Sequence, residues 1–329
     1  MRVLITGVHG FVGSNLVNYL AQPGSLFFSG YTIYGLDIIS PEKTGVAQTF
    51  SWEDLDAGRI PEVDAIIHLA GMAHDTKNQT AAEVYFKVNR DLTVKVYDYF
   101  CAHPQIKKFV FFSTAKAAAD RVEGVLTEDV VPAPVGPYGE SKIAAEEYIR
   151  ASEVWKTGSS AEPLRDGKQV YILRPCMIHG PGNKGNLNLL FNMVRKGIPW
   201  PLGAFDNRRT FSSVENVCFA VEGLLTKDVP TGIYNMGDDD ALSTNELIEV
   251  ICDALGKKAH IWRLPKGLMN GVARIGGWLH LPLNPDRMQK LTESYVSSNA
   301  KIKAALGIER MPVQARDGLR RTIKSFSLD

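Results

Sequence analysis

The sequence is poor in cysteine, and the few cysteines it has lie far apart. Only four occur in 329 residues, and no Cys-x-x-Cys pair is formed. This spacing argues against a disulfide framework and against a thiolate metal site, so we expect reduced, mostly buried thiols and no metal. The four residues are Cys101, Cys176, Cys218 and Cys252.

The chain also lacks an excess of one charge and lacks a long apolar run. Its 37 Lys and Arg are balanced by 36 Asp and Glu, which does not favour nucleic acid as a partner. No segment approaches the roughly 18 apolar residues that a membrane span requires. The apolar run Val3-Leu4-Ile5 begins too early to follow a charged leader. We therefore expect a cytoplasmic protein with no membrane and no nucleic-acid partner.

In the first half of the chain, short β-branched runs alternate with longer amphipathic stretches. This pattern is typical of a parallel sheet covered by helices on both faces, and it predicts a doubly wound α/β fold. The expected strands are Arg2–Thr6, Tyr31–Asp37, Ala65–Leu69, Lys108–Ser113 and Val170–Leu173. The expected helices are Phe11–Ala21, Ala82–Cys101 and Ser141–Ser152.

The texture of the sequence changes after Arg174-Pro175, where residues 179–186 are dense in turn formers. We therefore expect a Rossmann domain over residues 1–176 and a smaller, mostly helical substrate domain over 177–329. The chain is expected to re-enter the first domain around residues 210–236, with a strand at Gly232–Asn235. The stretch Leu268–Leu281 is interpreted as a packing or lid helix.

Three glycines, Gly7, Gly10 and Gly13, lie between the first expected strand and the first expected helix. Glycine at these places permits a tight turn, a close approach of a pyrophosphate to the backbone, and close packing of helix on strand. The amides at the start of the helix, at Phe11 and Val12, would then face the phosphates. This placement predicts a dinucleotide site.

Asp37 ends the second expected strand, where a carboxylate can bind the adenosine ribose hydroxyls. It lies farther from Gly7 than the usual ~20 residues, which we attribute to an insertion at Gln22–Gly30. A carboxylate would repel a 2′-phosphate, and no arginine lies next to it, so the sequence favours NAD over NADP. The alternative is an aspartate that only caps a turn or helix.

Tyr138 and Lys142 are four residues apart and share one face if a helix runs through them. That spacing is common by chance, and its setting carries more information. An ordered set of motifs resembles the extended short-chain dehydrogenases, and within them the nucleotide-sugar epimerases and 4-keto-sugar reductases. Residues 182–209 are most similar to the bacterial UDP-hexosamine branch. The motifs are Thr-Gly-x-x-Gly-x-x-Gly at 6–13, His68-Leu69-Ala70-Gly71, Ser113-Thr114, Tyr138 with Lys142, Arg174-Pro175 and Arg209.

The resemblance implies a role for each member of the set. Tyr138 would be the catalytic base, Lys142 would bind the nicotinamide ribose, and Thr114 would hold the reacting oxygen of the sugar. A phenol with a pKa near 10 becomes a base at pH 7 only with about 4 kcal/mol of preferential stabilisation of the phenolate. A nearby ammonium and an oxidised nicotinamide could supply it.

The resemblance also implies how the cofactor and the substrate are held. Ala70 and Gly71 would let the cofactor pass close to the backbone, and Asn89 would be structural. Arg209 would clamp the diphosphate of the substrate. The weaker substrate-binding candidates are Asn186 and Arg287.

Three functions stay open on the sequence alone. The first is an NAD-dependent epimerase acting at carbon 4 of a UDP-hexose or UDP-hexosamine through a transient 4-keto intermediate. The second is a UDP-4-keto-6-deoxyhexosamine 4-reductase for surface polysaccharide, and the third is a catalytically silent dinucleotide-binding sensor. The acidic pair of the dehydratases is absent at Ala115-Lys116, so 4,6-dehydration is not expected, and Lys116 could meet a phosphate or face solvent. By analogy with the family we expect a homodimer through Ala82–Cys101 and Ser141–Ser152.

Overall fold

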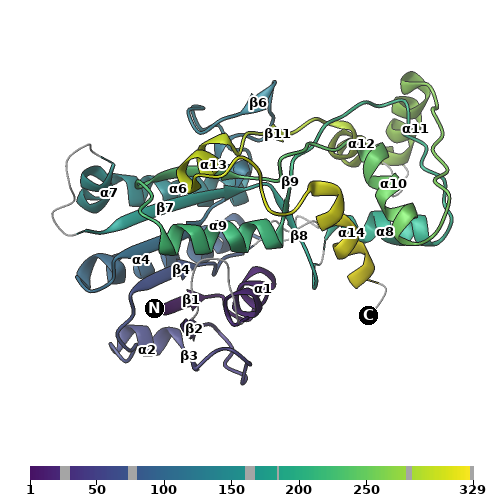
Figure 1. Cartoon of the computed structure of the whole chain (residues 1–329). Helices are drawn as coiled ribbons and strands as arrows, with labels where there is room; N and C mark the ends of the chain where they lie inside the picture. The colour runs from purple at the N-terminus through teal and green to yellow at the C-terminus, as the bar shows by residue number, and fades with distance from the viewer. Residues whose placement is uncertain (23–29, 73–79, 160–166, 184, 279–283, 327–329) are drawn as a thin grey trace.

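A computed structural model describes the chain except residues 23–29, 73–79, 160–166, 184, 279–283 and 327–329. Its centre is a seven-stranded parallel sheet with the order β10-β7-β5-β4-β1-β2-β3 (Figure 1). This confirms the doubly wound α/β fold. The strands are β1 (Arg2–Thr6), β2 (Thr32–Leu36), β3 (Gln48–Phe50), β4 (Ala65–His68), β5 (Lys108–Phe112), β7 (Gln169–Pro175) and β10 (Gly232–Met236). The expected insertion at Gln22–Gly30 lies mostly outside the described residues.

The order of the strands defines where a ligand can bind. Connections leave β1 toward β2 on one side, and the chain crosses to β4 on the other, so the switch of direction lies between β1 and β4. Thr6 is in register with both Leu36 and His68, which brings the carboxyl ends of these three strands to the same edge. In doubly wound sheets, ligands bind in the crevice at such an edge.

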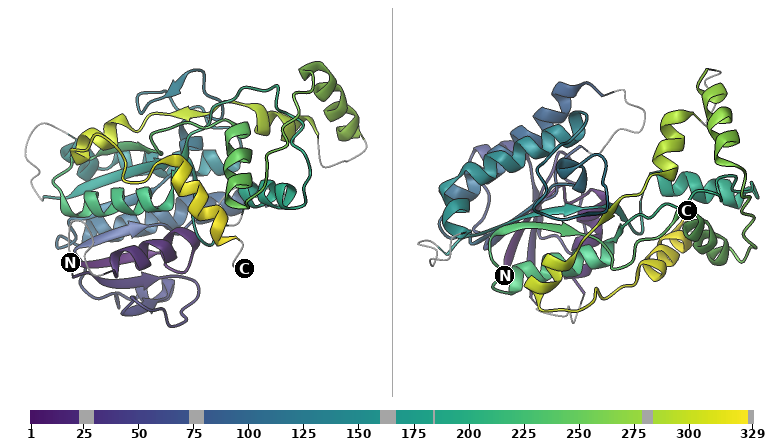
Figure 2. Two further views of the ribbon diagram at one scale, coloured as in Figure 1. Left: turned by 45° about the vertical axis from the view of Figure 1, so that its right-hand side comes forward. Right: turned by 90° about the horizontal axis from the view of Figure 1, so that it is seen from above.

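Helices cover both faces of the sheet, as the right-hand view of Figure 2 shows. One face packs against Leu16 of α1 and Val217 of α9, and the other against Tyr97 of α4 and Ile149 of α6. The expected helix Ala82–Cys101 is broken by a π-helical turn, η1. The bounds are α1 (Phe11–Leu20), α2 (Trp52–Asp56), α3 (Ala82–Tyr85), η1 (Phe86–Asp91), α4 (Leu92–Ala102), α5 (Ala115–Ala118), α6 (Pro137–Ala151), α7 (Glu153–Gly158) and α9 (Val214–Thr226).

A second, mostly helical lobe lies beside the carboxyl edge of the sheet (Figure 1). Its core joins Leu187, Leu247, Met269, Met288 and Leu319, one from each of its helices. The helices are α8 (Asn186–Arg195), α10 (Thr244–Ala254), α11 (Lys266–Trp278), α12 (Pro285–Thr292) and α14 (Ala315–Ser325). Two small strand pairs link the lobes, namely β8 (Met177–His179) with β9 (Phe211–Ser213) and β6 (Val125–Leu126) with β11 (Val296–Ser297).

The chain crosses between the two lobes more than once. After β9, α9 and β10 return to the sheet, where the sequence placed a strand and a re-entry. Near the end of the chain, α13 (Ala300–Leu306) also packs on the core of the sheet, through Ile302 and Leu306. We propose that the boundary near residue 176 separates a cofactor domain from a substrate domain, with both returns belonging to the first.

Candidate active site

The turn between β1 and α1 is built for close contact with a ligand. Gly7 has φ +67°, and a Cβ there would lie 2.9 Å from the backbone nitrogen of Ala70. A Cβ on Gly13 would lie 2.3 Å from the carbonyl oxygen of Gly7, so only glycine lets α1 start this close to β1. Gly10 caps α1 without any side-chain hydrogen bond. The amides of Phe11 and Val12 therefore start the helix without a capping side chain, as an anion site requires.

Asp37 lies directly after β2 and is half-buried beside this turn. Its carboxylate accepts hydrogen bonds from the backbone nitrogens of His9, at 3.0 Å, and Ile38, at 2.7 Å. Each carboxylate oxygen can accept more than one hydrogen bond, so capacity remains for two ribose hydroxyls. The turn and Asp37 together fit the pyrophosphate and the adenosine ribose of NAD.

A buried hydrogen-bond chain, which the sequence did not reveal, fixes the strand ends beneath the turn. Thr6 Oγ1 accepts from the backbone nitrogens of Leu69 and Ala70, and it lies 2.7 Å from His68 Nδ1. His68 Nε2 lies 3.0 Å from Thr93 Oγ1, whose hydroxyl donates to a backbone carbonyl. These directions assign a neutral imidazole with its proton on Nε2. Burial lowers the pKa of His68 to about 3, which keeps it neutral.

Asn89 holds the loop that follows β4, which agrees with the structural role expected for this residue. Its side chain accepts from the nitrogen of Met72 at 2.7 Å and donates to Ser141 Oγ at 3.0 Å. A Cβ on Gly71 would lie 3.0 Å from Asn89 Oδ1 and 3.1 Å from Lys142 Nζ. Ala70 and Gly71 therefore pass tightly between the glycine turn and the start of α6.

Thr114 and Tyr138 meet at the carboxyl edge of the sheet. Thr114 follows β5 and caps α5, while Tyr138 lies in the first turn of α6, which starts at Pro137 because proline is favoured there. Thr114 lies close enough to Tyr138 to lower the pKa of the phenol. Burial has the larger effect and raises the pKa of Tyr138. The chain alone therefore keeps this phenol protonated at neutral pH.

Lys142 lies one helical turn beyond Tyr138 and is buried. Its ammonium donates to the carbonyl of Phe112 at 2.8 Å and lies 5.0 Å from the ring centroid of Phe111. Burial lowers the pKa of Lys142 to about 8, against a smaller opposing effect of Glu146. Helix α6 runs through Tyr138 and Lys142, as their spacing predicted. The structure thus brings Thr114, Tyr138 and Lys142 to the carboxyl edge of the sheet.

The depressed pKa of Lys142 predicts a pH-dependent stability in the absence of cofactor. Between pH about 8 and 10.5 the unfolded lysine binds a proton that the folded one has released. The folded state therefore gains stability as the pH rises through this range. We expect the wild type to gain stability relative to Lys142→Met between pH 8 and 10, measured by urea unfolding. Lys87→Met, which removes an exposed lysine, should show no such trend.

A buried ion pair lies one turn further along α6. Glu146 and Arg174 are both fully buried, with Arg174 Nη2 at 2.5 Å from Glu146 Oε2. Ser113 donates a further short hydrogen bond to Glu146. Arg174 Nη1 has no hydrogen-bond partner among the described residues. The pair ties α6 to the ends of β5 and β7, and so positions Lys142 relative to Thr114.

The expected substrate-binding residues are distributed over the second lobe. Arg209 is half-buried and donates from Nη1 to the carbonyl of Lys290, on α12, at 2.5 Å. Arg287 is exposed on the first turn of the same helix. Asn186 is the first residue of α8, and its side chain lies outside the described part of the structure. Arg209 thus contacts α12, the helix that carries Arg287.

Lys116 is partly exposed, and its ammonium contacts a carboxylate and an aromatic ring of this chain. Its ammonium lies 2.9 Å from Asp120 Oδ1 and 4.9 Å from the ring centroid of Tyr295. Tyr295 in turn donates to the carbonyl of Ala119 at 2.9 Å. Lys116 therefore stabilises the contact between the α5 turn and β11.

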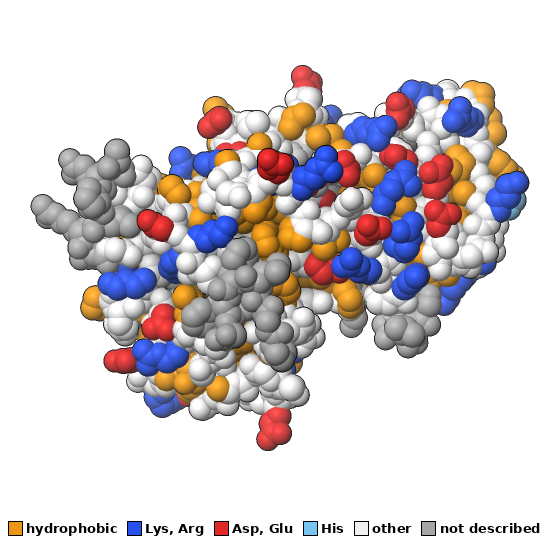
Figure 3. All heavy atoms as spheres, viewed as in Figure 1, with side chains coloured by type: hydrophobic (Ala, Val, Ile, Leu, Met, Phe, Trp, Pro, Cys, Tyr) orange, Lys and Arg blue, Asp and Glu red, His pale blue; other side chains and the backbone are white. Residues whose placement is uncertain are grey.

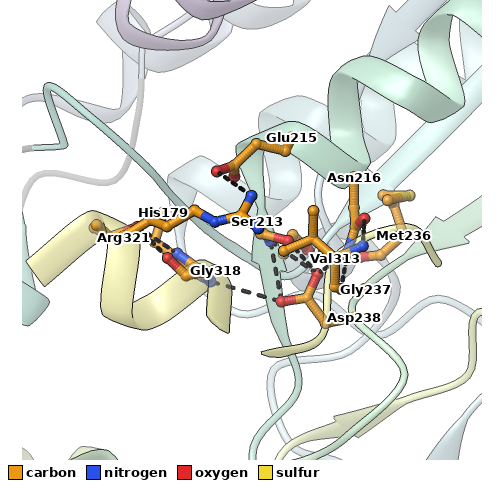
Figure 4. A network of polar contacts seen from close by, with 12 residues as sticks. His179, Ser213, Glu215, Asn216, Met236, Gly237, Asp238, Val313, Gly318 and Arg321 are labelled. Atoms are coloured by element: carbon orange, nitrogen blue, oxygen red, sulfur yellow. Dashed lines mark hydrogen bonds and ion pairs between the residues drawn. The ribbon is translucent and has the colours of Figure 1, made fainter. Parts of the chain in front are cut away.

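A second buried network, also not predicted, holds the two lobes together (Figure 4). Asp238 accepts from Ser213 Oγ at 2.7 Å and from Asn216 Nδ2 at 2.7 Å. His179 lies between two of these elements. Its Nε2 is 3.6 Å from Asp238 Oδ2, and its Nδ1 is 2.9 Å from Oγ1 of Thr322 on α14. These contacts fix β8, β9, α9 and α14 around the acidic turn after β10.

Two negative findings apply to the described residues. No group of three or more His, Cys, Asp and Glu side chains in them could hold a metal ion. No described helix has both the length and the apolar character needed to cross a membrane.

Comparisons with known proteins assign the family. Residues 3–237 match the NAD dependent epimerase/dehydratase family. The chain is 28% identical to a UDP-glucose 4-epimerase of Vibrio cholerae over 98% of this chain and 95% of that protein. It is 25% identical to a GDP-6-deoxy-D-mannose reductase of Pseudomonas aeruginosa over 77% of this chain and 79% of that one.

A solved structure agrees with the fold. The UDP-glucuronic acid 4-epimerase from Bacillus cereus, in complex with NAD, superposes with a TM-score of 0.72 at 19% identity, covering 100% of this chain and 99% of that one. The chain belongs to the NAD dependent epimerase/dehydratase family. The glycine turn, Asp37 and the sheet edge with Tyr138 agree with this assignment. The expectations of an extended short-chain dehydrogenase, an enzyme, and NAD as the cofactor are confirmed at the level of this family.

Proposed function

We propose that the protein is an epimerase that inverts carbon 4 of a UDP-hexose or UDP-hexosamine with NAD that it retains. The observation that carries this proposal is the placement of Thr114 close enough to Tyr138 to lower the pKa of its phenol, with Lys142 on the next turn of the same helix. These groups lie at the sheet edge that also holds the glycine turn and Asp37. The near full-length similarity to a UDP-glucose 4-epimerase supports the same substrate class.

Each residue has a distinct task in such a reaction. NAD held by the glycine turn and Asp37 would accept the hydride from carbon 4 and return it. Tyr138 accepts the proton of the 4-hydroxyl as the hydride leaves, and gives it back on return. Thr114 holds both the phenol and the reacting sugar oxygen by hydrogen bonds.

The pKa values explain why this chemistry requires the bound cofactor. Burial raises the pKa of Tyr138 in the protein alone, so the phenol stays protonated and inactive as a base. A positive charge in the same dry site favours the phenolate. Lys142 supplies one such charge below pH about 8, and Glu146 helps to keep it charged. Arg209 holds the diphosphate, so the sugar can turn over while its nucleotide stays fixed.

NMR of the anomeric signals tests the proposal directly. Purified protein is incubated with UDP-N-acetylglucosamine, and separately with UDP-glucose, without added cofactor. Growth of the carbon-4 epimer of either substrate is the expected result. If neither substrate changes while the protein is folded, the proposal fails.

The second candidate is a 4-keto-sugar reductase, favoured by the similarity to the GDP-6-deoxy-D-mannose reductase. A reductase consumes reduced cofactor in every cycle, so it needs NADH that exchanges freely. Consumption of NADH with a UDP-4-keto-6-deoxyhexosamine, together with inactivity in the epimerase assay, would assign this function instead.

Asp37→Asn tests the assignment of the ribose site. Loss of a charged acceptor costs roughly 1.5 to 3 kcal/mol per hydrogen bond, so the Kd for NAD should rise by about 10-fold or more. The repulsion against a 2′-phosphate disappears at the same time, so the preference for NAD over NADP should fall. Asp56→Asn, which removes an exposed carboxylate on α2, is the matched control and should leave both affinities unchanged. Calorimetric titration of the two cofactors measures the effect.

We also propose a homodimer through α4 and α6, which lie side by side on one face of the sheet and are joined by the hydrogen bond from Tyr148 to Asp98. Light scattering of the purified protein tests this. A monomeric mass at micromolar concentration would contradict it.

A further inference from the structure

Helix α11 exposes an apolar stripe on the outside of the second lobe. Leu268, Val272, Ile275 and Trp278 have exposed fractions of 55%, 44%, 59% and 81%. Their spacing of three and four residues places them along one side of the helix, because an α-helix has 3.6 residues per turn. Trp262, just before the helix, is also exposed.

The core of the second lobe does not need this stripe. The opposite side of α11 already supplies Met269 and Ala273 to that core, where they pack near Met288 of α12. The helix therefore has two apolar sides, one covered by its own lobe and one facing outward. Exposed side chains of this size on one helix side are typical of a contact surface.

The segment of sequence that contains α11 carries more positive than negative charge. Residues 254–292 contain seven Lys and Arg against a single Asp, whereas the whole chain has 37 against 36. Lys266 and Arg274 lie on α11 itself and are exposed. In Figure 3, blue and red side chains both lie over this end of the molecule, where Figure 1 places α11 and α12. The seven residues are Lys257, Lys258, Arg263, Lys266, Arg274, Arg287 and Lys290.

We propose that α11 docks this protein onto the surface of an anionic lipid bilayer. An amphipathic helix with Leu, Ile and Trp on one side and Lys and Arg beside them lies in the interfacial plane, with the apolar side among the acyl chains and the cations at the lipid headgroups. The helix has 13 residues, fewer than the about 20 that a span requires, so it lies on the membrane and does not cross it.

A second copy of the chain fits this surface less well. In a twofold-symmetric contact the same patch meets itself, which would bring the exposed Lys266 and Arg274 of the two copies into one interface. The proposal revises the expectation of no membrane partner, which was drawn from the lack of a long apolar run. It depends on the surface of α11 and not on the proposed function, so the failure of either leaves the other standing.

Flotation with lipid vesicles tests the proposal on the full-length protein. Vesicles of phosphatidylcholine with 30% or so phosphatidylglycerol are compared with pure phosphatidylcholine at low and high salt. We expect binding to the anionic vesicles, weakened by salt, and about 10-fold weaker binding for the double variant Leu268→Asn/Ile275→Asn. Lys266→Gln/Arg274→Gln should weaken binding to the anionic vesicles and reduce its dependence on salt.

Val131→Asn is the matched control, because Val131 is 84% exposed and lies outside α11. It should bind vesicles like the wild type, and circular dichroism should show that every variant is folded. Absence of binding to the anionic vesicles, or equal binding by the α11 double variant, would overturn the proposal. So would a loss of self-association in that double variant measured by light scattering, which would assign the stripe to a second copy of the chain.

Discussion

Tyr138→Phe is expected to lower the rate of sugar turnover by about 100- to 10,000-fold, the range typical of losing a positioned acid–base group. The substitution removes only the hydroxyl beside Thr114 and keeps the ring against Tyr85, 6.3 Å away between centroids. The affinity for NAD should change little, because the dinucleotide's phosphates and adenosine ribose are held elsewhere. Single-turnover kinetics and calorimetry measure the two effects.

Tyr148→Phe is the control for this experiment. It makes the same chemical change on the same helix, where the hydroxyl donates to the exposed Asp98. It should keep activity within a factor of a few. Activity of Tyr138→Phe within 10-fold of the wild type would exclude the phenol as the base. An unchanged biological function in an inactive Tyr138→Phe variant would favour the silent sensor.

Glu146→Gln is expected to lower the free energy of unfolding by about 3 to 5 kcal/mol, because it leaves the guanidinium of Arg174 buried without its counter-charge. Arg174 already has one nitrogen without a hydrogen-bond partner among the described residues, so little is available to compensate. The pKa of Lys142 should fall further, since Glu146 raises it. Urea unfolding and the pH dependence of activity measure these effects.

Two further variants separate charge from packing in this experiment. Glu147→Gln changes the neighbouring, exposed carboxylate and should alter stability by less than about 0.5 kcal/mol. The double variant Glu146→Leu/Arg174→Leu removes both charges and should recover much of the lost stability. If Glu146→Gln is as stable as Glu147→Gln, the ion pair does not hold α6 in place.

The local features of the fold and the site were predictable from the sequence. Continuous apolar runs marked the inner strands, because a parallel sheet buried on both faces excludes polar residues. The glycines of the first turn were recognisable because three glycines at this spacing, between a strand and a helix, are typical of a dinucleotide site. The helical spacing of Tyr138 and Lys142 also followed from their separation of four residues.

Features that depend on partners distant in the sequence were not predictable. His68 bonds Thr6 and Thr93, and Asp238 bonds Ser213 and Asn216, across gaps that no local pattern reveals. The raised pKa of Tyr138 follows from burial, which depends on the assembled fold. The sequence of α11 likewise did not show which of its apolar side chains the second lobe covers and which stay exposed.

The central claim is that a hydride leaves carbon 4 and returns to it on a cofactor the protein keeps. UDP-N-acetylglucosamine and UDP-glucose carrying deuterium at carbon 4 test this claim, with the protein in ordinary water and no added NAD or NADH. The account predicts that the carbon-4 epimer forms from at least one of them and retains the deuterium. Formation of an epimer that has exchanged its deuterium for solvent hydrogen, or no epimer until NADH is supplied, would contradict it.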